Sequence, residues 1–179
     1  MKSQIRQELL LLTYLIIMLG LILGKEAKGD TIGEVTRVVM NIQPKNDTLK
    51  STKIASKIIL TSKKLDLSWV TYTAMLVQES MLLDDPNGSM YSCTDCGLTQ
   101  IHYPTWGEVL GLDKYRLVYD TMYSMDISYR ILKRYKKQYG HEQDWYTRYH
   151  SSTPVIRERY RLAISEKVYM ILQMIGGTL

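Results

Sequence analysis

Glu79 is the residue whose surroundings in the sequence most strongly suggest chemistry. If residues 70–83 form one helix, the positions three and four away from Glu79 are all apolar: Met75, Leu76, Leu82 and Leu83. The spacing therefore places the Glu79 carboxylate on the apolar side of the helix. Such a carboxylate is either paired or has a raised pKa, and a raised pKa suits a general acid near neutral pH. The alternative is a Glu at the edge of the apolar stripe whose carboxylate reaches water.

The polar loop after this helix holds possible second carboxylates. It runs from Asp84 to Asp95, and Asp84, Asp85 and Asp95 are the candidates. Asp95 would make hydrolysis plausible if it faced Glu79 across a gap that holds one water molecule. The interpretation that we favour is a loop carboxylate that caps a backbone turn.

Cys93 and Cys96 are the only two cysteines of the chain. In an oxidising compartment this spacing favours a local disulfide. A thioredoxin-like redox site would need a βαβ pattern, which the sequence lacks. A zinc site would need two further ligands, and the chain has only three histidines to supply them. We expect no metal and no cofactor.

Three short motifs follow one another along the chain: Glu79-Ser80, Gly97-Leu98-Thr99-Gln100 and Tyr149-His150. In this order they resemble the marks of the soluble lytic transglycosylases, lysozyme-like enzymes that cut peptidoglycan. That family has Glu-Ser at a helix end, then Gly-Leu-Met-Gln, then Tyr-Asn before a final helix. The segment 55–80 also looks like the family's first two helices. The resemblance covers roughly residues 50–168.

The resemblance implies both a substrate and a mechanism. The substrate would be the β-1,4 bond between N-acetylmuramic acid and N-acetylglucosamine in the glycan strands of peptidoglycan. Glu79 would act first as acid and then as base, and the product would carry a 1,6-anhydro ring made without water. The rival functions are a lysozyme-type hydrolase on the same fold and a wall-binding structural protein with little activity.

The resemblance also assigns substrate-binding positions. Gln100 matches a sugar-binding Gln, and Ser92 is preferred to Ser89 as the serine near the acetamido group. Thr99 stands where the family has Met, which would change the floor of the cleft. Ser80 is expected to bond the helix end rather than the substrate.

Tyr149 and His150 match the family's last motif. Tyr149 matches a Tyr that hydrogen-bonds near the catalytic Glu, and its alternative is a core Tyr. His150 replaces an Asn, and it either flanks the cleft or caps the following turn.

The N-terminus has the pattern of an export signal. Lys2 and Arg6 precede an uncharged run at 9–23, and Ala27-Lys28-Gly29 offers a cleavage site. Residues 1–29 are therefore a signal peptide or an uncleaved membrane anchor, and a buried core helix is disfavoured because the run is apolar all round. Either reading exports the domain to the periplasm or cell envelope.

The remaining pattern predicts a mainly α, lysozyme-like single domain at 49–179, after a linker or loose arm at 30–48. A small β-hairpin in the cleft loop is possible around Asn87-Gly88. Within the arm, Val35, Val38 and Val39 could form a short ordered piece. Apolar spacing and capping residues predict helices at 49–64, 70–83, 104–110, 120–139 and 154–175.

The charge balance bears on possible partners. The net charge is +5, and residues 1–29 account for +2 of it, which leaves +3 for the exported part. This modest excess suits an anionic wall polymer or membrane surface and gives no argument for nucleic acid. The basic run 130–137 is expected to face water, with a glycan-facing or membrane-facing surface as the alternative. Components of a secretion apparatus, a conjugation apparatus or a virion are possible partners.

Overall fold

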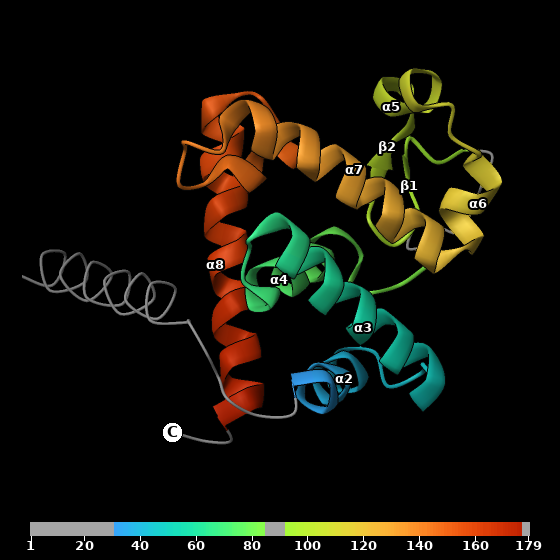
Figure 1. Cartoon of the computed structure of the whole chain (residues 1–179), viewed down its shortest axis with the longest axis vertical. Coiled ribbons are helices and arrows are strands. Elements are labelled where there is room, and N and C mark those ends of the chain that lie inside the picture. The colour runs from blue at the N-terminus through green and yellow to red at the C-terminus, as the bar shows by residue number, and fades with distance from the viewer. Residues whose placement is uncertain (1–30, 85–91, 177–179) are drawn as a thin grey trace, which may run out of the picture. The chain divides into compact units, whose positions relative to one another are not determined.

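The computed structural model describes residues 31–84 and 92–176. The elements in chain order are α2 (Thr31–Ile42), α3 (Thr48–Leu65), α4 (Trp69–Ser80), β1 (Asp95–Cys96), β2 (Ile101–His102), α5 (Tyr103–Leu110), α6 (Lys114–Tyr119), α7 (Thr121–Tyr139), the 3-10 helix η1 (Trp145–Tyr149) and α8 (Pro154–Gly176). Figure 1 shows their arrangement. The predicted mainly α class is confirmed.

The predicted signal peptide or anchor at 1–29 lies outside the described residues. Residues 32–84 and 92–176 belong to one compact unit of the chain. Within 31–84 and 92–176, no helix combines the length and the apolar character needed to cross a membrane.

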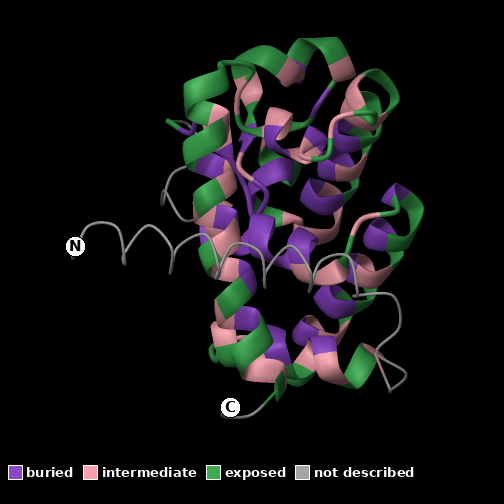
Figure 2. Ribbon diagram, turned by 90° about the vertical axis from the view of Figure 1, so that its left-hand side faces the viewer, coloured by how far each residue is buried: buried purple, intermediate pink, exposed green. Residues whose placement is uncertain are grey.

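The core lies where α3, α4, α7 and α8 meet. α8 packs along α4, and α3 packs against both α4 and α7. The buried faces of these helices point toward one another in Figure 2. Tyr72 is the largest fully buried side chain of this core, and its hydroxyl lies 3.4 Å from Oγ of Ser128. The pair gives the buried hydroxyl the partner that it needs.

Local signals set the start and end of the helix that carries Glu79. Oγ of Ser68 accepts a hydrogen bond from the backbone N–H of Val70 and caps the start of α4. The helix ends at Ser80 because Met81 takes a left-handed conformation with φ 55°. The predicted end at residue 83 is wrong, and Leu83 is 41% exposed. Leu82 nevertheless turns back into the core.

The predicted linker at 30–48 is wrong for its longest part, because Thr31–Ile42 is helix α2. Val35, Val38 and Val39 have no exposed surface and belong to the main core. They lie at positions i, i+3 and i+4, which is one face of a helix. The predicted short ordered piece at these three valines is confirmed.

The only strands in the described part of the chain lie next to the cleft loop. β1 and β2 are antiparallel, with Asp95 opposite His102 and Cys96 opposite Ile101. The predicted hairpin around Asn87-Gly88 falls within 85–91, outside the described residues.

Candidate active site

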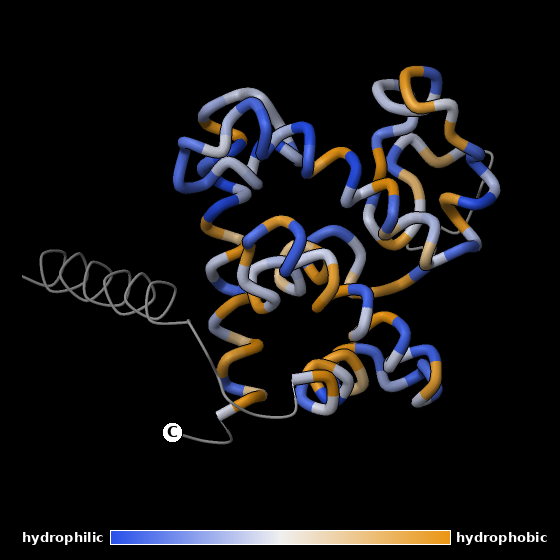
Figure 3. Tube along the Cα trace, viewed as in Figure 1, coloured by the Kyte–Doolittle hydropathy of each residue, from blue (hydrophilic) through white to orange (hydrophobic). Residues whose placement is uncertain are grey.

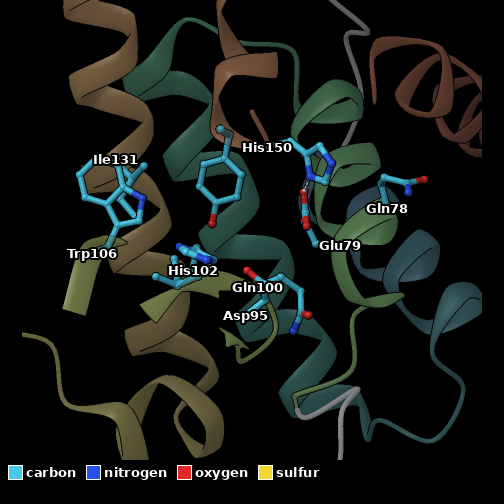
Figure 4. A pocket seen from close by; sticks show the side chains of 10 residues that line it. Gln78, Glu79, Asp95, Gln100, His102, Trp106, Ile131 and His150 are labelled. Carbon is cyan, nitrogen blue, oxygen red and sulfur yellow. Dashed lines mark ion pairs between the residues drawn. The ribbon is translucent and has the colours of Figure 1, made fainter. Parts of the chain in front are cut away.

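A pocket of about 470 Å³ lies between α4, the β1–β2 sheet, α7 and η1. Its lining consists of Gln78, Glu79, Asp95, Gln100, Ile101, His102, Trp106, Ile131, Tyr149 and His150. Figure 4 shows Glu79 and His150 on one side, with Trp106 and Ile131 on the other. The pocket therefore brings together Glu79, Asp95, Gln100, Tyr149 and His150, which the sequence named as candidates.

Glu79 lies in the last turn of α4, and only 11% of its side chain is exposed. Burial raises the pKa of its carboxyl group from the ordinary value of 4.5 to about 7, and the charge of Asp95 adds to the rise. A hydrogen bond from Tyr160 opposes the rise. The predicted apolar surroundings of Glu79 are thus present, and its carboxyl group exchanges a proton near neutral pH.

Tyr160 in α8 is the direct partner of Glu79. Its hydroxyl donates a 2.6 Å hydrogen bond to Oε1 of Glu79. The ring of His150 stacks on the ring of Tyr160, with centroids 4.5 Å apart and planes at 4°. Nδ1 of His150 lies 4.0 Å from the same Oε1. One hydrogen bond from α8 and the nearby His150 ring thus position this carboxyl oxygen.

Tyr160 lies within the predicted helix 154–175, but the sequence did not name it as a site residue. The available signal was its hydroxyl group, because a buried Tyr needs a hydrogen-bond partner. Its partner is 81 positions away in the chain. Gln78, His102, Trp106 and Ile131 also line the pocket without having been predicted, and their sequence positions give no such signal.

Asp95 lies in β1 and lines the same pocket as Glu79. Its negative charge raises the pKa of Glu79. The pKa of His150 is lowered by burial, and the charge of Asp95 opposes that lowering. Asp95 thus belongs to a strand that borders the pocket, and the interpretation that we favoured for it, a turn-capping loop carboxylate, stays a prediction. The structure places two carboxyl groups in one pocket.

Asp84, the other candidate carboxylate in the described residues, lies outside this pocket. Its carboxylate pairs with Lys50 and accepts a hydrogen bond from Thr121.

Side chains from α4 and η1 form hydrogen bonds to the turn between β1 and β2. The hydroxyl of Ser80 donates a 2.6 Å hydrogen bond to the carbonyl of Leu98. The hydroxyl of Tyr149 donates one of 2.7 Å to the carbonyl of Thr99. Gln100 has φ 48°, and its side-chain amide donates to the carbonyl of Gly97. The three motifs of the sequence therefore meet in space. The predicted helix-end bond of Ser80 is present at 3.4 Å to the carbonyl of Leu76, and its shorter bond is the one to the turn.

Two predicted substrate contacts do not fit. Thr99 is fully buried, and its hydroxyl lies 2.8 Å from Oγ of Ser124 and donates to the backbone carbonyl of Ser124. Thr99 therefore links the β1–β2 turn to α7 and does not form the pocket floor. Ser92 is exposed and does not line the pocket. Ser89 lies outside the described residues.

Cys93 and Cys96 form a disulfide, in agreement with the predicted pairing. Both residues are buried in a second core cluster beside Ile101, Ile127 and Ile131. The bridge closes the chain immediately around Asp95. It therefore restrains the backbone of the strand that places Asp95 in the pocket.

An ion-pair network holds the segment between α7 and α8 that carries Tyr149 and His150. The guanidinium of Arg157 bonds Glu142 at 2.9 Å and Asp144 at 3.1 Å, and its Nε donates to the hydroxyl of Thr147. Arg148 makes a second pair with Glu142 at 2.6 Å. The network ties η1 to the start of α8, which also carries Tyr160.

No family model, curated protein or solved structure matches this chain. Within residues 31–84 and 92–176, no group of three or more His, Cys, Asp or Glu side chains is placed to hold a metal ion. The chemistry that the pocket offers is proton transfer by Glu79 beside a second carboxylate, with amide, imidazole and phenol groups nearby.

Two substitutions should move the pKa of Glu79 in opposite directions. Tyr160→Phe removes a hydrogen bond that stabilises the carboxylate, so the pKa should rise. Asp95→Asn removes a negative charge that destabilises the carboxylate, so the pKa should fall. The pKa can be followed by NMR titration of the Glu79 side-chain carboxyl carbon. Shifts of the same sign in both variants would contradict this account.

Proposed function

We propose that this protein is a peptidoglycan lytic transglycosylase with a lysozyme-like fold. The observation that carries the proposal is the Glu79 carboxyl group, buried at the side of a pocket with a pKa of about 7. The resemblance of the three motifs supplies the substrate, the bond between N-acetylmuramic acid and N-acetylglucosamine.

In the proposed reaction, protonated Glu79 donates its proton to the glycosidic oxygen as the bond from that oxygen to C1 breaks. The substrate's acetamido group supports the positive charge that grows on C1. The Glu79 carboxylate then takes the proton from the C6 hydroxyl of the same sugar, and this oxygen bonds to C1. One group serves as acid and then base, so a pKa near the working pH suits both steps.

Tyr160 has a positioning role in this proposal. Its hydroxyl donates to Oε1 of Glu79, so Oε2 is the oxygen that carries the proton toward the substrate. His150 stacks on Tyr160 and limits its movement. Gln100 and His102 offer hydrogen-bonding groups to sugar hydroxyls in the same pocket.

A second candidate function is hydrolysis on the same fold, and Asp95 is the observation that favours it. A second carboxylate in the pocket could hold and activate a water molecule, as inverting glycosidases do. Ring closure still has an intramolecular advantage, because the C6 hydroxyl is already attached to the reacting sugar. We therefore keep the transglycosylase as the first proposal.

Mass spectrometry of the soluble fragments from purified sacculi distinguishes the two reactions. We expect muropeptides that end in 1,6-anhydro-N-acetylmuramic acid, one water lighter than the reducing form. Mainly reducing ends would instead establish a hydrolase, and Asp95→Asn should then abolish the release of fragments. Sacculi that bind the protein and release nothing would favour a structural wall-binding role.

The setting follows from the same proposal. An exported or membrane-anchored domain would act on the wall in the periplasm or cell envelope. A small domain of this kind would open the wall locally for a secretion apparatus, a conjugation apparatus or an entering virion.

A further inference from the structure

The C-terminal half of α7 presents four cations on one exposed face. They lie at positions i, i+3, i+4 and i+7, the spacing of a single helix face: Arg130, Lys133, Arg134 and Lys137. We call these four residues the basic face. It extends about 10 Å along the helix axis. Figure 3 shows hydrophilic residues gathered where α7 meets η1.

The basic face has no acidic partners within 31–84 and 92–176, since none of its four residues forms an ion pair there. Other cations nearby do have partners: Lys57 pairs with Asp126 and Lys136 with Asp66. Like charges three and four residues apart destabilise a helix. An anion bound across the face would remove this repulsion.

The basic face approaches the pocket at Arg134. Ile131, the residue after Arg130, lines the pocket from α7. The guanidinium of Arg134 lies 5.7 Å from the ring centroid of Trp106, which lines the same pocket. A chain bound in the pocket and passing Trp106 would therefore meet the basic face next.

The aromatic ring of Tyr129 lies beside the basic face. The Nζ atoms of Lys64 in α3 and Lys133 lie 5.4 Å and 6.0 Å from the ring centroid of Tyr129. Cations that alternate with aromatic rings suit a ligand that carries both carboxylates and apolar groups.

We propose that the basic face binds carboxylates on the peptide side chains of the polymer whose glycan strand enters the pocket. The inference rests on the proposed function and extends it, because it gives the enzyme a second contact with its substrate outside the pocket. The polymer is favoured as occupant because Arg134 of the basic face lies beside Trp106 of the pocket lining. Charge complementarity beside a pocket mainly speeds capture of the ligand, and it makes the binding sensitive to salt concentration.

The test measures binding of the full chain to intact sacculi in the background of Glu79→Gln, which keeps the polymer whole. The variant R130Q/K133Q/K137Q leaves Arg134 and Trp106 in place. Its matched control is R37Q/K45Q/K53Q, which removes the same charge from exposed residues of α2, the α2–α3 loop and α3. Circular dichroism should show that both variants keep their helices.

We expect the dissociation constant for sacculi to rise about tenfold in the R130Q/K133Q/K137Q variant at low ionic strength, and to change little in the control. The difference should disappear at about 0.5 M salt, because screening then acts within a few ångströms. Sacculi whose carboxylates have been amidated should bind the unsubstituted basic face about as weakly as they bind R130Q/K133Q/K137Q.

Equal binding by the two triple variants would overturn the inference. So would a loss of binding to vesicles of anionic phospholipid, or to nucleic acid, with binding to sacculi unchanged. Release of anhydro-muropeptides by the wild-type chain is scored separately. If the wild-type chain cuts sacculi and the two triple variants bind equally, only this inference is overturned. A chain that binds through the basic face without cutting overturns only the proposed catalysis.

Discussion

Glu79→Gln is expected to reduce clearing of purified sacculi about a thousandfold, within the range that a general acid–base contributes. Gln has nearly the size of Glu, and its amide oxygen can still accept the hydrogen bond from Tyr160. The substitution therefore removes the exchangeable proton and leaves the packing in place. Clearing is measured as loss of turbidity, and near-normal clearing by a folded variant would reject Glu79 as the catalytic group.

The stability of the Glu79→Gln variant, measured by unfolding at two pH values, shows whether it folds and whether burial raises the pKa of Glu79. The pKa of Glu79 is raised from 4.5 to about 7 in the folded chain, so between these values the native state holds a proton that the unfolded state has lost. Stability from this group is present below pH 4.5 and is lost as the pH rises through 7. Glu79→Gln avoids that loss and should be more stable at pH 8 by at most about 3 kcal/mol.

At pH 4 the same substitution should give no gain, because Glu79 is then protonated in the folded state. Urea unfolding at pH 4 and pH 8 measures both values. A variant that is less stable than wild type at pH 8 would show that the carboxylate is not strained by its burial.

The sequence predicted the helices that carry strong local signals. α3, α5, α7 and α8 have regular apolar spacing, and α4 has its cap at Ser68. The sequence missed α6 and η1, which are short, and it named only the three valines of α2, a helix dominated by polar and β-branched residues. Their helical state depends on packing against the rest of the domain, which no local pattern records.

The sequence named Gln100, Tyr149 and His150 of the candidate site from short motifs, and Glu79 also from its local pattern. Glu79 was found because its own neighbours are apolar. Tyr160 was not found, since its bond to Glu79 depends on the packing of α4 against α8. Thr99 was wrongly assigned to the floor of the cleft. The left-handed conformation of Gln100 turns the chain, so the side chains of Thr99 and Gln100 point in different directions. Such reversals follow from backbone angles that the motif does not show.

Gly97 is the residue of that turn with the strictest requirement, for two separate reasons. Its φ is +74°, a conformation that costs a residue with a side chain about 1–2 kcal/mol. A Cβ atom at this position would also lie 1.8 Å from the backbone carbonyl oxygen of Leu117 and 3.0 Å from Oγ of Ser124. Relief of the first contact requires movement of the backbone, because a carbonyl cannot rotate away as a side chain can.

Gly97→Ala is therefore expected to lower the free energy of unfolding by about 2–5 kcal/mol, the sum of left-handed strain and overpacking. Gly111→Ala is the matched control, because Gly111 has φ +60° and no atom within 4 Å of an added Cβ. It should lose only the strain, about 1–2 kcal/mol. Urea unfolding of both variants separates the two contributions, and equal losses would show that the approach of Leu117 adds nothing. Since the turn also holds Leu98, Thr99 and Gln100, binding to sacculi should weaken in Gly97→Ala and persist in Gly111→Ala.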